Sequence, residues 1–121
     1  MAKRVLIVDD ALFMRTLLRD IFTAAGWNIV AEAENGLQAI EQYHLQQPDL
    51  VSMDIVMPEM GGIDAMKTIL STDPAAVVVV CSALGQESMI MEAIKAGAKD
   101  FIVKPFSDAQ VLEVIERVAA G

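Results

Sequence analysis

Hydrophobic and polar positions divide the chain into two kinds of segment that follow one another in strict alternation. Short runs rich in valine and isoleucine are typical of strands, whereas longer stretches with apolar residues three or four positions apart are typical of helices. The pattern predicts strands over residues 4–8, 28–33, 49–54, 76–81 and 100–103, and helices over about 11–25, 36–46, 62–72, 86–96 and 107–119. Such alternation predicts an α/β domain with a parallel sheet.

The apolar content of single segments indicates where they lie in the fold. Positions 5–8 and 77–80 are apolar throughout, as in parallel strands that helices cover on both faces. Residues 28–33 include Asn28 and Glu32, which is typical of an edge strand. The helical spacing of the first two helices is carried by Leu12, Leu17, Leu18, Ile21 and Phe22, and by Leu37, Ile40 and Leu45.

The residues at the predicted helix ends agree with these boundaries. Gly26 and Gly97 directly follow helical stretches, where a left-handed residue is often needed. Asp108 is a candidate N-cap for the last helix.

The composition fits a single domain over residues 1–121, because 55 % of the residues are hydrophobic and can form a sizeable core. No apolar run approaches the ~18 residues of a membrane-spanning helix. Acids interrupt the first apolar run too early for a signal peptide. The lone cysteine, Cys81, agrees with a reducing compartment, so we expect a cytoplasmic protein.

The net charge of −8 argues against direct binding of DNA or RNA, whose phosphates would repel the domain. A domain this acidic is better suited to cations or to a basic segment of a partner.

Chemically active residues follow four of the predicted strands. Asp9 and Asp10 come after the first, Asp54 ends the third, Ser82 follows the fourth and Lys104 follows the fifth. Ligands of parallel α/β sheets bind beyond the carboxyl ends of the strands. We therefore expect three carboxylates, a hydroxyl and an ammonium at one edge of the sheet.

Clustered carboxylates of this kind predict a magnesium site. Two negative charges ~4 Å apart repel by about 4 kcal/mol at an effective dielectric constant near 20, and a divalent cation reverses that balance. Mg²⁺ prefers oxygen ligands and often takes one or two carboxylates together with a phosphate. The pattern therefore predicts that Asp9, Asp10 and Asp54 bind Mg²⁺ together.

The segments "LIVDD" (6–10), "MDIVMPEMGG" (53–62), "CSA" (81–83) and "FIVKPF" (101–106) resemble the receiver domains of two-component response regulators. The resemblance covers the chain from Lys3 to Val118 and is strongest to stand-alone regulators of chemotaxis. It implies a doubly wound, flavodoxin-like fold of five parallel strands in the order 2-1-3-4-5 with five helices.

The resemblance also assigns roles to the residues at the strand ends. It implies that Asp54 accepts a phosphoryl group from a histidine kinase in an Mg²⁺-dependent reaction. We therefore expect a signalling protein that promotes its own phosphorylation and dephosphorylation, rather than an enzyme. The metal ligands would be Asp9, Asp10, Asp54 and the backbone carbonyl of Val56. Lys104 would pair with a phosphoryl oxygen, and the peptide bond between Lys104 and Pro105 would be cis.

A conformational switch and an output surface follow from the resemblance and from the helix pattern. Ser82 would donate to a phosphoryl oxygen, and Phe101 would turn inward in response. The apolar residues of 86–96 cover more than one helical stripe, so we expect part of this surface to bind a partner helix. The candidate residues are Ile90, Ile94, Phe101 and Val114, and the implied partner is the flagellar motor switch protein.

Val56 and Leu84 stand at positions where many members of the family carry polar side chains that can orient an attacking water. Neither side chain can do so. We therefore expect slow loss of the phosphoryl group without a partner phosphatase. We also expect a monomer.

Other functions remain open from the sequence. A phosphatase or phosphotransferase with an aspartate nucleophile usually has a second acid two residues later, where this chain has Val56. A flavin-binding electron carrier would need a phosphate loop where this chain has Asp9 and Asp10, which would repel a phosphate. A phosphorelay intermediate, or a receiver domain excised from a larger response regulator, stays an alternative.

Overall fold

Parallel strands form one central sheet in the computed structural model, which describes residues 3–120. The strands within that range are β1 (Arg4–Val8), β2 (Asn28–Ala33), β3 (Leu50–Asp54), β4 (Val78–Ala83) and β5 (Asp100–Lys104). Their spatial order is β2-β1-β3-β4-β5, with every neighbouring pair parallel. This arrangement confirms the predicted α/β class and the sheet order.

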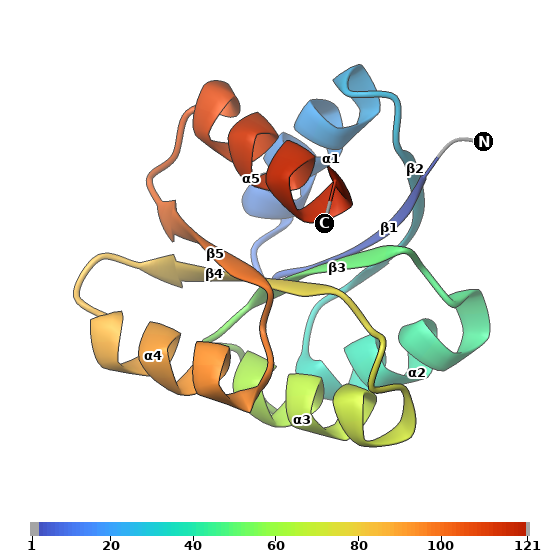
Figure 1. Cartoon of the computed structure of the whole chain (residues 1–121), viewed down its shortest axis with the longest axis vertical. Coiled ribbons are helices and arrows are strands. Elements are labelled where there is room, and N and C mark those ends of the chain that lie inside the picture. Colours follow the sequence, from blue (N-terminus) through green and yellow to red (C-terminus); the bar gives the residue numbers. More distant parts are fainter. Residues whose placement is uncertain (1–2, 121) are drawn as a thin grey trace.

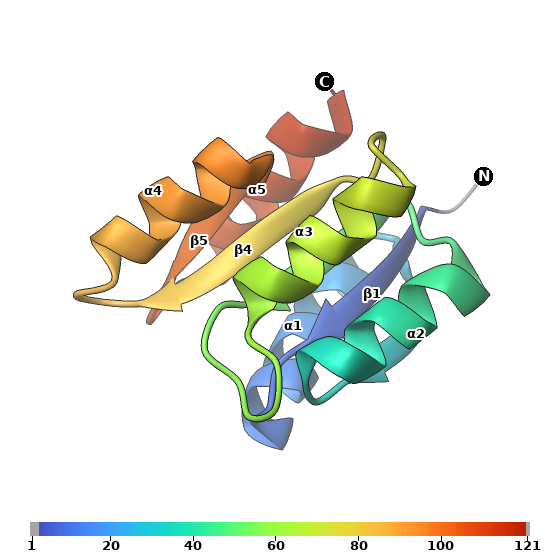
Figure 2. The same ribbon diagram turned by 90° about the horizontal axis from the view of Figure 1, so that it is seen from below.

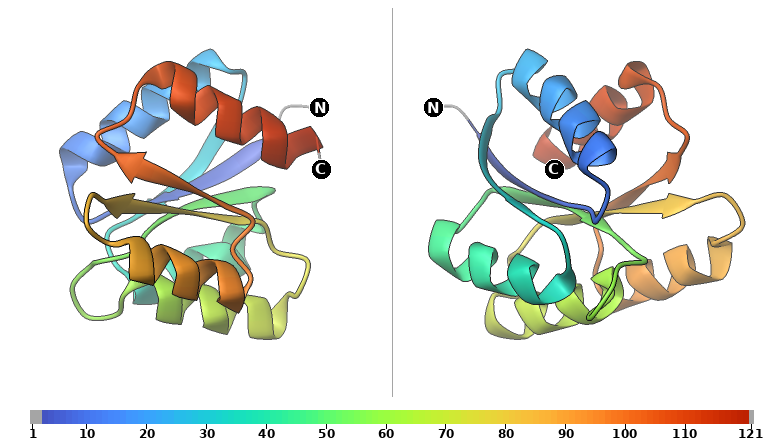
Figure 3. Two further views of the ribbon diagram at one scale, coloured as in Figure 1. Left: turned by 60° about the vertical axis from the view of Figure 1, so that its left-hand side comes forward. Right: turned by 180° about the vertical axis from the view of Figure 1, so that it is seen from behind.

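Helices cover both faces of the sheet. They are α1 (Leu12–Ala24), α2 (Gly36–Gln46), α3 (Gly62–Thr72), α4 (Glu87–Ala96) and α5 (Asp108–Ala120). Helices α1 and α5 lie on one face, and α2, α3 and α4 lie side by side on the other (Figures 1 and 2). The views in Figure 3 show the same two layers from other sides. None of the helices described is long and apolar enough to cross a membrane.

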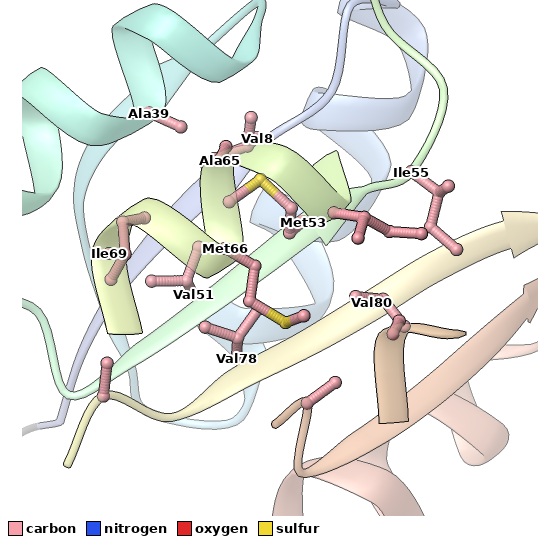
Figure 4. Close-up of a cluster of buried hydrophobic side chains, with 14 of the residues drawn as sticks. Val8, Ala39, Val51, Met53, Ile55, Ala65, Met66, Ile69, Val78 and Val80 are labelled. Atoms are coloured by element: carbon pink, nitrogen blue, oxygen red, sulfur yellow. The ribbon is translucent and has the colours of Figure 1, made fainter. Parts of the chain in front are cut away.

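Each strand supplies side chains to two separate cores, because successive residues of a strand point to opposite faces. Val51 and Met53 of β3 pack with Met66 and Ile69 of α3 in the core shown in Figure 4. Leu50 belongs instead to the core under α1 and α5. Burial on both faces explains why the inner strands are apolar at nearly every position. The two cores hold the strand ends rigidly.

The fourth strand lies further along the chain than the predicted range 76–81. It begins at Val78 and ends at Ala83, because Ser82 and Ala83 still pair with Val103 and Lys104 of β5. A serine and an alanine carry little strand signal, so sequence pattern placed them in the loop. The difference makes Ser82 a residue of the sheet, with a fixed backbone.

In α2 the leucines that carry the helical spacing do not face the core. Leu37 and Leu45 are exposed, whereas Ala39 and Tyr43 are buried against the sheet. Small residues allow α2 to lie close to its neighbours, and Gly36 donates its backbone N–H to the carbonyl of Met60 at 2.9 Å. Leu12 of α1 is likewise exposed.

The helix ends are mostly as predicted, with one correction. Gly26 and Gly97 have φ values of 89° and 120°, in the region that favours glycine. Asp108 is the first residue of α5 rather than its cap. The Ser107 hydroxyl accepts from the Gln110 N–H at 3.2 Å, and the Gln110 side chain accepts from the Ser107 N–H at 2.8 Å. This reciprocal pair is a capping box.

Candidate functional site

The carboxyl ends of four neighbouring strands bring the predicted site residues together. Asp9 follows β1, Asp54 ends β3, Ser82 lies in β4 and Lys104 ends β5. The register pairs Asp54 with Cys81, directly before Ser82. Because β1 and β3 lie next to each other in the sheet, Asp9 and Asp54 meet although 45 positions separate them in the chain.

Three carboxylates form the centre of the site. One oxygen from each of Asp9, Asp10 and Asp54 lies within 4.8 Å of the other two. Asp9 and Asp54 are buried, at 1 % and 7 % exposed, whereas Asp10 is exposed. An all-oxygen donor set that is closed on one side and open on the other fits a hard divalent cation that keeps some of its water.

Lys104 provides a positive charge that pairs with two of these carboxylates. Its Nζ donates to Asp9 Oδ2 at 2.8 Å and lies 3.3 Å from Asp54 Oδ1. Burial lowers the pKa of Lys104, but the hydrogen bond to Asp9 and the charges of Asp54 and Asp9 outweigh it and raise the pKa overall. Lys104 therefore stays an ammonium. The Lys104–Pro105 bond is cis, as the resemblance implies.

Asp54 carries negative charge that its surroundings do not fully compensate. Burial and then the neighbouring charge of Asp9 raise the pKa of Asp54 to about 6, although Lys104 acts in the opposite direction. The raised pKa makes the carboxylate more basic than an ordinary aspartate. It also indicates that an additional cation beside Asp54 would be favourable.

The Ser82 hydroxyl is buried without a hydrogen-bond partner among the described residues. A buried hydroxyl without a partner costs about 1–3 kcal/mol, so a polar group that reached it would be bound favourably. The Phe101 ring of β5 is 41 % exposed, so it is not packed like a core side chain.

Apolar side chains lie in the loops that surround the carboxylates. Val56, after β3, and Leu84, after β4, are 53 % and 73 % exposed. The side chains of this apolar rim have no hydrogen-bonding group, so they cannot hold a water molecule in line with Asp54.

The predicted output surface is partly corrected by the structure. Ile94 and Phe101 are exposed, but Ile90 and Val114 are each only 8 % exposed. Ile90 lies on the face of α4 that packs in one core, and Val114 lies on the face of α5 that packs in the other. Met91 takes the exposed position on α4 instead, at 57 %. Met91, Ile94 and Phe101 line a shallow, mainly apolar hollow of about 900 Å³ between α4, β5 and α5.

The sequence pattern did not single out Arg15, whose guanidinium touches the site from α1. Its Nη1 donates to the backbone carbonyl of Asp9 at 2.8 Å. The signal was present, because Arg15 lies on the same helical stripe as Leu18 and Phe22, and a charged residue on a buried stripe indicates a buried ion pair.

Comparison with known families and proteins agrees with this geometry. The family model of the response regulator receiver domain matches residues 5–116. The chain is 59 % identical to the chemotaxis protein CheY of Thermotoga maritima, over 98 % of this chain and 99 % of the relative. It is 58 % identical to CheY of Bacillus subtilis, over 97 % and 98 % of the two chains.

The fold is also similar to that of a solved structure. A chain in the crystal structure of the CheX–CheY–BeF3–Mg²⁺ complex from Borrelia burgdorferi superposes with a TM-score of 0.91 at 41 % identity. The match covers 97 % of this chain and 89 % of that one.

Proposed function

Because the chain belongs to the response regulator receiver domain family, we propose that it is a phosphoacceptor of a two-component system. In this proposal Asp54 takes a phosphoryl group from a histidine kinase, and the modified domain changes its binding to an output partner. The family match over residues 5–116 also supports assigning residues 1–121 to one receiver domain.

One observation carries the proposal. Asp54 is the residue at which three carboxylates within 4.8 Å and the Lys104 ammonium, 3.3 Å away, come together. A basic carboxylate beside a fixed positive charge and a cation site is what transfer of a phosphoryl group to an aspartate needs.

The transfer itself makes one bond and breaks one. An oxygen of Asp54 attacks phosphorus while the bond between phosphorus and the histidine nitrogen of the kinase breaks. The electron pair of that bond returns to the imidazole, so no further acid or base is required from this chain. Phosphoryl transfer depends mainly on positioning and charge stabilisation, and the rigid strand ends provide the positioning.

The residues present fit Mg²⁺ as the cation of this reaction. Asp9, Asp10 and Asp54 supply carboxylate oxygens, and the backbone carbonyl of Val56 is the further ligand that family resemblance suggests. When bound, Mg²⁺ would supply charge stabilisation for the oxygens of the transferring phosphoryl group.

Lys104 and Ser82 give the modified state contacts that the unmodified state lacks. The Lys104 ammonium can leave Asp9 and pair with a phosphoryl oxygen, and the unpartnered Ser82 hydroxyl can donate to another. A modification shifts a two-state equilibrium only through such differential contacts. Movement of Ser82 would free space beside β5, toward which the exposed Phe101 ring can turn.

The experiment that tests the proposal is incubation with a radiolabelled small phosphodonor, with Mg²⁺ and with a chelator. Stoichiometric label that requires the cation supports the assignment. Label that is unchanged by chelation contradicts the role of the carboxylate cluster.

The likeness to chemotaxis proteins supports the flagellar motor switch protein as the output partner. The exposed apolar hollow between α4, β5 and α5 suits an amphipathic helix of that partner. An Ile94→Glu variant, activated with beryllofluoride, should bind the switch protein about tenfold more weakly, which is ~1.4 kcal/mol. The matched control is Leu45→Glu, which places the same charge on α2 at a leucine that is more exposed than Ile94, at 69 % against 38 %. Equal binding by the two variants would place the output surface elsewhere.

The apolar rim supports a long phosphoryl lifetime and removal by a partner phosphatase. A Val56→Asn variant adds an amide that can orient water, so its phosphoryl group should be lost about tenfold faster. Decay of label after removal of the phosphodonor measures this rate. Leu45→Asn, at the opposite end of α2 from the site, makes the same type of change at an exposed leucine and should leave the rate unchanged. A Val56→Asn rate equal to that control would refute the explanation.

A further inference from the structure

Arg15 is a buried cation that the phosphoryl chemistry does not use. Its side chain is only 9 % exposed. The guanidinium makes three polar contacts at once: Nη1 with the Asp9 carbonyl at 2.8 Å, Nε with Glu32 Oε1 at 3.2 Å, and Nη2 with Glu34 Oε1 at 3.5 Å. A cation in this position is costly to desolvate unless such contacts satisfy it.

The backbone of Asp9 is held from both sides by these contacts. Its N–H donates to the carbonyl of Ala33 on β2 at 3.0 Å, and its carbonyl accepts from Arg15. Glu32 also belongs to β2, and Glu34 follows that strand directly. The edge strand contributes no ligand to the site, yet it fixes the residue that does.

The orientation of Asp10 depends on the same peptide group. The Asp9 carbonyl and the Asp10 N–H belong to one planar unit, so a bond to that carbonyl sets the plane from which the Asp10 side chain departs. Asp10 is exposed, and within residues 3–120 its carboxylate has no hydrogen bond or ion pair of its own. Its direction is therefore left to the backbone.

Arginine is required for this combination. Its planar fork presents donors in several directions, whereas a lysine ammonium is a single point charge on a flexible stem. Arg19, one turn further along α1, also contacts Glu32, at 3.3 Å, but its side chain is 59 % exposed and does not touch Asp9. Both arginines contact Glu32, but only Arg15 also contacts Asp9.

We propose that Arg15, anchored by Glu32 and Glu34, is a positioning residue that orients the Asp9–Asp10 peptide and thereby sets the affinity of the carboxylate cluster for Mg²⁺. The proposal rests on the metal-dependent function above. It acts through the two aspartates, and Arg15 itself does not contact the metal or the phosphoryl group.

The test compares Arg15→Met with Arg19→Met. Isothermal titration with Mg²⁺ alone should show about tenfold weaker binding for Arg15→Met, the usual loss when a residue that orients metal ligands is removed. Arg19→Met should stay within about twofold of the wild type, because it loses only an exposed ion pair. At saturating Mg²⁺ the labelling rate of Arg15→Met should return close to the wild-type rate.

A spectroscopic readout in metal-free protein separates positioning from general loosening of the fold. The amide resonance of Asp10 should shift in Arg15→Met and stay unchanged in Arg19→Met, since only Arg15 bonds to that peptide. Arg15→Lys keeps a charge for the glutamates and is the variant to use if Arg15→Met does not fold. It should reproduce the Asp10 shift and weaken Mg²⁺ binding severalfold.

A folded Arg15 variant with wild-type Mg²⁺ affinity and an unshifted Asp10 amide would overturn the proposal. Failure of the proposed function looks different. In that case the wild type itself would bind no Mg²⁺ or take no label, while the Asp10 amide would still respond to Arg15→Met.

Discussion

An Asp54→Asn variant is expected to take up at least about a hundredfold less phosphoryl label than the wild type, a loss of ~2.7 kcal/mol of transition-state stabilisation. The asparagine amide has the shape of the carboxylate but lacks its negative charge, so it cannot attack phosphorus. We do not expect Asp9 or Asp10 to replace it, because Asp9 is only 1 % exposed and Asp10 lies at the exposed side of the cluster. The measurement is label bound per chain after incubation with a small phosphodonor and Mg²⁺.

The variant should remain folded, which separates loss of chemistry from loss of structure. The folded-state pKa of Asp54 is raised to about 6, so ionisation of this carboxylate opposes folding. That penalty develops as the pH rises from the unfolded pKa of about 4 through 6, and it is fully present at pH 7. Metal-free Asp54→Asn should therefore melt at or above the wild-type temperature at pH 7. Normal labelling of this folded variant would exclude Asp54 as the acceptor.

The parts of the fold that sequence predicted well are those where burial is nearly complete. Val5 to Val8 are buried on both faces, so every position had to be apolar and the strand was unmistakable. Strand β4 was placed too early in the chain because Ser82 and Ala83, which end it, carry little strand signal. The α2 helix was found, but Leu37 and Leu45 suggested the wrong face, since close packing there favours Ala39. The spacing of apolar residues predicts that a helix is present more reliably than it predicts which face of that helix is buried.

The candidate site was predicted as far as strand ends could determine it. Asp9, Asp54 and Lys104 meet because parallel strands end at one edge. The output surface was harder to predict from sequence, because Ile90 and Ile94 lie one turn apart on α4, and the packing of α4 against α3 and β4 decides which of them is covered. Arg15 was missed because its partners, Glu32 in β2 and Glu34 directly after it, belong to a part of the chain that supplies no ligand.

The site residues are positioned mainly by hydrogen bonds and strand pairing of their backbone. Asp9 is fixed by β2 and α1, and Lys104 by β4 through the pairing of Ala83 with Lys104. Asp54 is the last residue of β3, and the helix that follows comes back against its backbone. Gly62 is the residue at that close approach. We therefore expect its substitution to be tolerated as poorly as substitution of a ligand.

A Gly62→Ala variant is expected to lose about 3 kcal/mol of folding free energy, because a Cβ at this position would overlap the backbone carbonyl of Asp54 and crowd the Met53 side chain. The glycine N–H also donates to the carbonyl of Ile55 at 2.8 Å, which keeps the start of α3 from moving away. For a domain of this size the loss corresponds to a fall in melting temperature of about 10 °C. Thermal unfolding followed by circular dichroism measures it.

Gly61→Ala is the matched control, since the two glycines are adjacent and only one is crowded by Asp54. A Cβ at Gly61 would lie 3.1 Å from the Ile55 carbonyl, and its φ of −72° suits alanine, so its stability should stay within about 1 kcal/mol of the wild type. Gly62→Ala should also weaken Mg²⁺ binding below its melting temperature, because relief of the overlap displaces Asp54. Equal melting temperatures for the two variants would show that α3 can move aside, and that the backbone of Asp54 is held less tightly than the structure indicates.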